Sequence, residues 1–146
     1  MKDLKLTIGI DFDGTCTTHD FPEIGKDIGA IPILKQLVID GHKLILFTMR
    51  SNIESPTTTD TDIYTTGGQY LTDAVNWFKD NGIELYGIQT NPTQKQWTNS
   101  PKAYCNLYID DAGLGIPLTT DLSISSRTFV DWIEVKKLLT ASNILK

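Results

Sequence analysis

The sequence predicts an α/β fold, a three-layer α/β/α sandwich with a central, mainly parallel sheet. Three observations lead to this prediction. Short apolar segments rich in β-branched residues alternate with segments that carry apolar residues at helical spacing. The apolar segments are hydrophobic on both faces, as the buried strands of parallel sheets are. The 146 residues fit one domain, 1–146, with a core of its own.

The first part of the chain predicts two strands joined by a helix. Residues 4–13 and 42–49 are the two apolar strand segments. Between them, residues 28–41 carry apolar side chains at helical spacing, with Pro32 in the first turn and Gly41 as a stop. A strand, helix and strand in this order predict parallel pairing through a right-handed crossover.

The middle of the chain predicts a long loop and a second helix. Residues 51–68 are polar and rich in threonine, and we expect an irregular, functional loop there. Residues 68–82 form the helix, with Leu71, Val75 and Phe78 on its inner stripe.

The last third of the chain predicts further strands and a closing helix. A loop at 91–104 runs into a short helical turn, and the helix at 131–142 places Trp132 and Val135 inward. The strand segments are 83–90, 105–111 and a short fifth one at 115–120.

Charge and composition exclude several classes of protein. The net charge of −5 argues against a nucleic-acid binder, which usually presents a basic patch. No apolar run is long enough to span a membrane, and the first residues lack a signal peptide. Cys16 and Cys105 have no metal-type spacing, so we expect two reduced thiols. Together these features predict a cytoplasmic protein without a membrane partner.

Residues with chemically active side chains lie at the ends of the predicted strands or just before them. Because the carboxyl ends of parallel strands share one edge, where α/β sheets bind their ligands, we expect these residues to gather there. They are Asp11 and Asp13 after the first strand, Thr48 after the second, Lys102 just before the fourth, and Asp110 and Asp111 after it.

So many carboxylates in one place call for a cation. Two like charges about 4 Å apart repel by roughly 4 kcal/mol at an effective dielectric constant near 20. Either some carboxyl groups stay protonated or a cation lies between them. Since the donors are oxygens only, a hard ion is favoured, and we expect Mg²⁺.

The same residues suit phosphoryl transfer. An aspartate can attack phosphorus as a nucleophile, and a hydroxyl and an ammonium group, Thr48 and Lys102, can hold the phosphoryl oxygens. Asp13 follows Asp11 by two residues, so an extended chain places both side chains on one face. Asp13 could then protonate the leaving oxygen and later take a proton from water.

Four segments in this order, "DFDGT", "TMR", "PK" and "DD", resemble the haloacid dehalogenase-like phosphohydrolases, and the resemblance extends from the first strand to "YIDD". It implies a Rossmann-like core and an aspartyl-phosphate mechanism. By this resemblance Asp11 is nucleophile and Mg²⁺ ligand, Asp13 is general acid/base with its carbonyl on Mg²⁺, Thr48 and Lys102 bind phosphate, and Asp110 or Asp111 completes the metal site, with Asp110 favoured.

The resemblance also indicates the kind of member. An acid at Asp13 fits phosphatase chemistry, whereas family members with other reactions carry threonine or alanine there. No segment is large enough for a cap domain, so the resemblance is to the small capless members of the family, and we expect no large cap domain. We expect a small-molecule phosphate ester as substrate. A homo-oligomer, in which a second subunit covers the site, remains an alternative. So do a non-catalytic or phosphoacceptor phosphate-binding module, and a phosphatase for nucleic-acid ends or phosphoproteins.

Two further residues near these segments receive structural roles. We expect Arg50 to pair with a nearby carboxylate and brace its loop rather than bind phosphate. For His19 we expect a hydrogen bond within the segment after "DFDGT".

Overall fold

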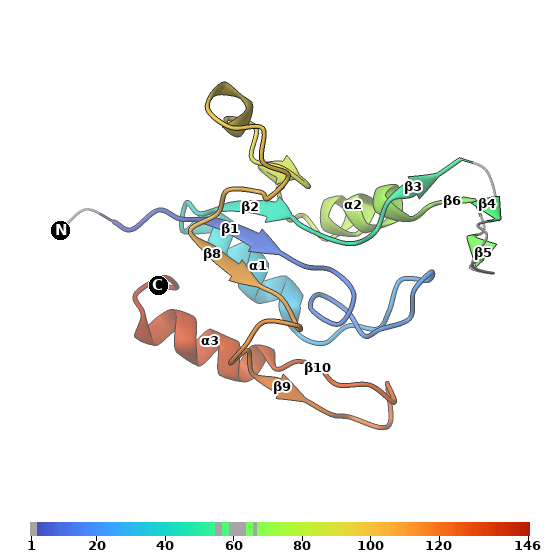
Figure 1. Cartoon of the computed structure of the whole chain (residues 1–146). Coiled ribbons are helices and arrows are strands. Elements are labelled where there is room, and N and C mark those ends of the chain that lie inside the picture. The colour runs from blue at the N-terminus through green and yellow to red at the C-terminus, as the bar shows by residue number, and fades with distance from the viewer. Residues whose placement is uncertain (1–2, 55–56, 59–63, 66) are drawn as a thin grey trace.

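A computed structural model describes residues 3–54, 57–58, 64–65 and 67–146, and it shows the predicted α/β class. Its centre is a four-stranded parallel sheet in the order β7–β2–β1–β8 (Figure 1). In chain order these strands are β1 (Thr7–Ile10), β2 (Lys43–Leu46), β7 (Gly87–Ile88) and β8 (Leu107–Ile109).

Strand β1 lies in the middle of the sheet and sets its register. Gly9 is paired with Ile45 of β2 on one side and with Tyr108 of β8 on the other. Every pairing in this sheet is parallel, which confirms the sequence prediction. The carboxyl ends of β1, β2 and β8 therefore meet at one edge, on the right of Figure 1.

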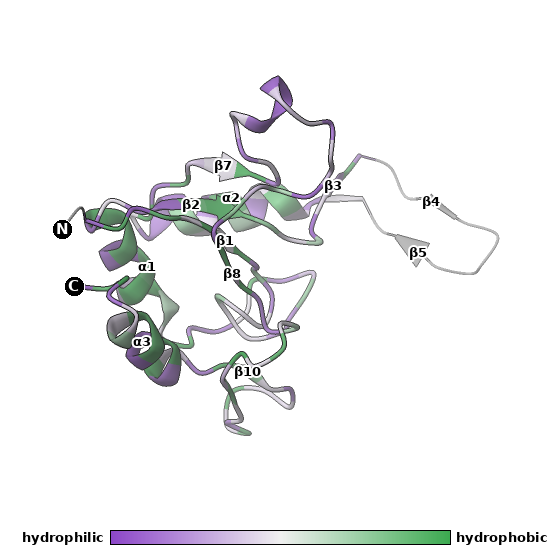
Figure 2. Ribbon diagram, turned by 60° about the vertical axis from the view of Figure 1, so that its left-hand side comes forward, coloured by the Kyte–Doolittle hydropathy of each residue, from purple (hydrophilic) through white to green (hydrophobic). Residues whose placement is uncertain are grey.

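One face of the sheet carries the hydrophobic core and the helices α1 (Ala30–Ile39), α2 (Tyr70–Asp80) and α3 (Trp132–Ala141). Alternate strand residues pack into this core because side chains of a strand alternate between its faces. Figure 2 shows the hydrophobic colour on these strands. The core residues from the strands are Ile8, Ile10, Leu44, Leu46 and Ile109.

The opposite face is covered by the segment 89–106, which contains one turn of 3₁₀ helix, η1 (Gln94–Gln96). Tyr108 contacts this segment through its hydroxyl, which donates to the carbonyl of Ala103. Buried Gln94 fixes the segment by donating to the carbonyls of Ser100 and Lys102. The third layer of the predicted sandwich is thus a loop with a single helical turn rather than an α-helix.

The helix boundaries follow the predicted signals. Pro32 lies in the first turn of α1, and Gly41 after its end has φ +93°, a conformation that favours glycine. At the start of α3, the Asp131 side chain accepts hydrogen bonds from the N–H groups of Ile133 and Glu134.

The prediction of an irregular loop at 51–68 is wrong for the residues that the structure describes there. They form short antiparallel pairs, because backbone N–H and carbonyl groups can pair whatever the polarity of the side chains. The pairs lie in an arm beside the sheet edge (Figure 1). They are β3 (Asn52–Ile53) with β6 (Gly68–Gln69), and β4 (Thr57–Thr58) with β5 (Tyr64–Thr65). Residues 55–56, 59–63 and 66 of the predicted loop lie outside the described residues.

The predicted fifth strand forms outside the central sheet. It is β9 (Leu118–Thr119), and it pairs antiparallel with β10 (Phe129–Val130) in a separate ribbon that leads into α3. Val130 donates its N–H to the carbonyl of Gly14. The ribbon is therefore tied to the loop after β1.

Helix length and polarity bear on membranes. Within the described part of the chain, every helix is too short or too polar to cross a bilayer.

We predict that Leu37→Ala lowers the free energy of unfolding by about 2–5 kcal/mol, since Leu37 is fully buried in α1 and its truncation leaves a cavity. The matched control is Leu122→Ala, because Leu122 is 80% exposed, and we expect a change within about 0.5 kcal/mol there. Urea unfolding of both variants measures the difference. Equal losses would contradict the placement of the core.

Candidate active site

The loop after β1 places two acids around a buried anchor. Asp11 continues the sheet by donating its N–H to the carbonyl of Ile109 at 3.0 Å. Phe12 is fully buried, with its ring against those of Trp77 and Phe78 on the helix side of the sheet. Asp11 and Asp13, on either side of Phe12, stay half-buried at the sheet edge. Burial of the middle residue thus fixes the position of both acids.

Three of the predicted acids come together. Carboxylate oxygens of Asp11, Asp110 and Asp111 lie within 4.8 Å of one another, and all three residues are half-buried. The first comes from the end of β1 and the other two from the end of β8. Their convergence results from the parallel pairing of these two strands.

Thr15 joins the two sides of this acidic cluster. Its fully buried hydroxyl donates to Asp11 Oδ2 at 2.8 Å and accepts the N–H of Asp111 at 3.0 Å. Its own carbonyl accepts a 2.7 Å hydrogen bond from the indole of Trp132 at the start of α3. Trp132 in the hydrophobic core therefore fixes Thr15, and Thr15 in turn fixes Asp11 and Asp111. Sequence reasoning gave Thr15 no role, although its place in "DFDGT" was the available signal.

The cluster carries more negative charge than it can hold uncompensated. Burial, the hydrogen bond with Asp111 and the charge of Asp110 raise the pKa of Asp11 from 3.8 to about 8, against smaller opposite effects of Thr15 and the Phe12 backbone. At neutral pH the site therefore retains a proton or takes up a cation. An all-oxygen set of carboxylates fits a hard divalent ion such as Mg²⁺.

Asp13 does not join the cluster through its carboxylate. Instead, Arg50 binds both of its oxygens, with Nε 2.8 Å from Oδ2 and Nη2 2.8 Å from Oδ1. This is the carboxylate pairing that the sequence predicted for Arg50. Because each carboxylate oxygen offers two lone pairs, the bidentate pair orients Asp13 and leaves capacity on both oxygens.

Thr48 lies in a turn that is held by the side chain of Gln89, the residue after β7. Its hydroxyl oxygen accepts the N–H of Arg50 at 3.1 Å. The amide of Gln89, after β7, accepts the Thr48 N–H at 2.9 Å and donates to the carbonyls of Thr48 and Arg50 at 2.7 and 3.1 Å. Gln89 has φ +64°, a costly conformation for a residue with a side chain. These bonds define the turn rigidly, and they hold Thr48 through partners other than the acidic cluster.

Lys102 lies on the segment that covers the sheet. Its Nζ is 5.5 Å from the centre of the Tyr108 ring, and its carbonyl is held by Gln94 at 2.9 Å. Among the residues that the structure describes, Lys102 forms no ion pair. The structure thus brings together three of the predicted acids, and it leaves Asp13, Thr48 and Lys102 in separate contacts around them.

His19 contacts the cluster directly. Its Nε2 lies 2.9 Å from Asp111 Oδ2, and its side chain is 15% exposed. The ring packs over Gly14, where a Cβ atom would lie 1.9 Å from the same nitrogen and where φ is +79°. The expectation of a hydrogen bond within the segment after "DFDGT" is therefore wrong in its partner, because His19 instead contacts an acid 92 positions away in the chain. Sequence spacing gives no signal for that partner.

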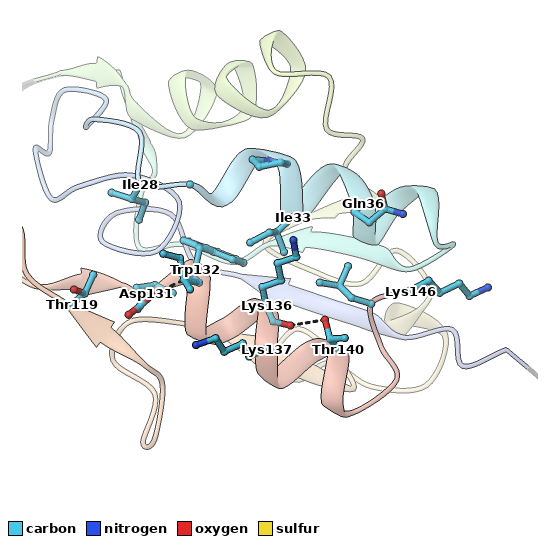
Figure 3. Close-up of a pocket in the computed structure, with 15 residues that line it drawn as sticks. Ile28, Ile33, Gln36, Thr119, Asp131, Trp132, Lys136, Lys137, Thr140 and Lys146 are labelled. Atoms are coloured by element: carbon cyan, nitrogen blue, oxygen red, sulfur yellow. Dashed lines mark hydrogen bonds between the residues drawn. The ribbon is translucent and has the colours of Figure 1, made fainter.

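A cavity of about 790 Å³ lies elsewhere, between α1 and α3 (Figure 3). Ile33, Trp132, Lys136 and Thr140 are among the residues that line it, and the three acids of the cluster lie outside its lining. The volume of a cavity therefore does not identify the candidate site. The acidic cluster is chosen because of its charge and its position at the carboxyl edge of the sheet.

Comparisons with known proteins support the fold. No protein-family model and no curated protein matches the chain. A solved structure of a conserved protein coded by a locus of Bacteroides thetaiotaomicron matches with a TM-score of 0.64 and 29% sequence identity, over 98% of this chain and 99% of that one. The similarity extends over the whole described architecture and gives no activity.

We predict that Thr15→Val weakens Mg²⁺ binding about 10- to 100-fold, because valine keeps the shape and removes the hydroxyl that orients Asp11 and Asp111. The matched control is Thr140→Val, since that hydroxyl donates to the Lys136 carbonyl within α3, away from the cluster. The Mg²⁺ dependence of the melting temperature measures both affinities. Identical affinities in the two variants would refute the bridging role.

We also predict a pH effect in the metal-free protein. Between pH 3.8 and about 8 the folded protein keeps a proton on Asp11 that the unfolded chain has released. The free energy of unfolding therefore falls as pH rises through this range. Urea unfolding with a chelator, at several pH values, measures the slope, and Asp11→Asn should flatten it. A variant with the wild-type slope would contradict this assignment.

Proposed function

We propose that the protein is a Mg²⁺-dependent phosphohydrolase that cleaves a phosphate monoester through an aspartyl-phosphate on Asp11. The observation that supports it most directly is the convergence of Asp11, Asp110 and Asp111 at the carboxyl edge of a parallel sheet. This is the position of ligand sites in open α/β sheets. The order of the surrounding residues along the chain, which resembles that of the haloacid dehalogenase-like phosphohydrolases, supports the same reaction.

The acidic cluster would hold the metal. In the proposal Asp11, Asp110 and Asp111 supply carboxylate oxygens, and Asp13 supplies its backbone carbonyl. When bound, Mg²⁺ would screen the negative charge between the carboxylates and the phosphate and stabilise the transition state. Because the pKa of Asp11 is raised to about 8 without a cation, the ion would also keep Asp11 ionised and nucleophilic.

The other predicted residues would serve the substrate. In this proposal the hydroxyl of Thr48 and the ammonium group of Lys102 bind the phosphoryl oxygens. Thr48 lies in a rigid turn, and the Lys102 ammonium is at the end of a long side chain. Lys102 would approach the phosphate only when substrate supplies the counter-charge. Asp13, oriented by Arg50, would face the leaving group.

The reaction proceeds in two balanced steps. First, Asp13 takes up a proton from solvent; a carboxylate oxygen of Asp11 then attacks phosphorus while the bond from phosphorus to the ester oxygen breaks, and Asp13 gives this proton to that oxygen. Second, water attacks the phosphorus of the aspartyl-phosphate and gives a proton to Asp13. The bond to Asp11 breaks, inorganic phosphate leaves, Asp13 releases its proton to solvent, and both acids return to their starting states.

The substrate would be a small-molecule phosphate ester, since the chain has a net charge of −5 and a nucleic acid would be repelled. We propose a cytoplasmic location because Cys16 and Cys105 are both unpaired, as is usual for thiols in a reducing compartment. A homo-oligomer would supply a second subunit near the open edge.

We predict that the wild-type protein hydrolyses p-nitrophenyl phosphate with Mg²⁺, and that Asp11→Asn lowers kcat by more than about 10⁴-fold, since the nucleophile is lost. The control is Asp80→Asn, an exposed acid at the end of α2, which should keep full activity. Release of nitrophenolate and of phosphate measures turnover. If the wild-type protein hydrolyses none of a broad panel of phosphate esters, the proposal of an enzyme is wrong and that of a non-catalytic phosphate-binding module takes its place.

A further inference from the structure

Arg50 uses every N–H of its guanidinium group. A guanidinium has five N–H donors in a fixed plane. Two of them bind the carboxylate of Asp13. The remaining three donate to backbone carbonyls: Nη1 to Pro22 at 3.4 Å and to Tyr70 at 3.3 Å, and Nη2 to Glu23 at 2.8 Å. The group is therefore saturated and has no donor left for a phosphate.

Aromatic rings also enclose the guanidinium. Its central carbon lies 5.0 Å from the ring centre of Phe12 and 5.1 Å from that of Phe21, which itself packs against Tyr70. The Arg50 side chain is only 1% exposed. Stacking and saturation together fix its orientation, because a planar cation between rings cannot turn without losing several contacts.

These contacts connect three separate parts of the chain. Asp13 belongs to the loop after β1, Pro22 and Glu23 belong to a turn closed by the Glu23 N–H and the Asp20 carbonyl, and Tyr70 begins α2 next to the arm. The turn and the start of α2 therefore meet the acid/base candidate through one side chain.

We infer that Arg50 is a positioning residue for the proposed hydrolysis: it fixes the carboxylate of Asp13 toward the leaving group and ties it to the turn at 20–23 and the start of α2. This inference rests on the proposed function. It assigns Arg50 no contact with substrate. Lysine could keep the charge, but its single ammonium with three donors cannot reproduce a planar set of five contacts.

The first experiment compares Arg50→Lys with Arg127→Lys. Arg127 is exposed and is the second of the two arginines in the chain, so it provides the same substitution without these contacts. Initial rates are measured on p-nitrophenyl phosphate, whose leaving group needs little protonation, and on a simple alkyl phosphate, whose leaving group needs a proton. Thermal melting and Mg²⁺ titration are measured for each variant.

We expect Arg50→Lys to lower kcat/KM about 100-fold on the alkyl phosphate, through misplacement of Asp13, and far less on the nitrophenyl ester. The reason is that kcat/KM reports the steps up to formation of the aspartyl-phosphate, in which only the alkyl leaving group needs a proton. KM and Mg²⁺ affinity should stay near wild type, because the donors of Arg50 are spent on Asp13 and on backbone carbonyls. Arg127→Lys should behave as wild type. An equal loss of kcat/KM on both esters would overturn the inference while leaving the phosphatase in place, whereas an inert wild type would overturn the phosphatase and the positioning role together.

A double-mutant cycle tests whether Arg50 acts through Asp13. In an Asp13→Asn background, Arg50→Lys should cause no further loss on the alkyl phosphate, since the group it positions is already gone. Additive losses would contradict the inference.

If Arg50→Lys does not fold, Asp13→Asn carries the test by hydrogen exchange. Loss of the ion pair should speed amide exchange at residues 21–24 and 70–72 relative to wild type. Unchanged exchange in both segments would overturn the connection.

Discussion

Mutual repulsion among Asp11, Asp110 and Asp111 is the constraint on which the site depends. Their oxygens lie within 4.8 Å of one another, so the folded chain must hold together groups that would separate in water. Thr15 does this with one hydroxyl, which bonds Asp11 and the backbone of Asp111, and His19 contacts Asp111 as well. Burial first, and then the neighbouring Asp111 and Asp110, raise the pKa of Asp11, and a proton or a cation relieves the charge.

The hydrophobic core supplies the rigidity that this repulsion requires. Phe12 is buried between the two acids after β1, so neither acid can retreat into solvent without pulling an aromatic ring out of the core. Trp132 reaches from α3 to the carbonyl of Thr15, and Val130 binds the carbonyl of Gly14. Packing in the core therefore fixes the positions of the carboxylates at the sheet edge. A site that acts through fixed charges needs such defined positions.

Sequence patterns predicted the features that strand order determines, and they missed those that depend on contacts between distant parts of the chain. Parallel pairing alone brings Asp11 to Asp110 and Asp111, so their meeting was foreseeable from strand ends. The contact of His19 with Asp111 spans 92 positions, and no periodicity records it. The antiparallel pairs of 52–53 with 68–69 and of 57–58 with 64–65 differ from the predicted loop, because backbone pairing does not require apolar side chains. The loop with a short helical turn predicted at 91–104 is present, but the hydrogen bonds of buried Gln94 that hold it against the sheet could not be read from the sequence.

Two aspartates only two positions apart end in opposite electrostatic surroundings. The neighbours of Asp11 are carboxylates, and the neighbour of Asp13 is a guanidinium of opposite charge. Phe12 separates them by taking the intervening side chain into the core. Such a division suits a reaction that needs two carboxyl groups with different tasks, because groups with the same surroundings would behave alike. The chain supplies the positive partner of Asp13 itself, whereas the charge at Asp11 is relieved by a proton or by a cation. In the proposed reaction, a divalent cation would therefore act at the cluster around Asp11, and Arg50 would orient the carboxylate of Asp13.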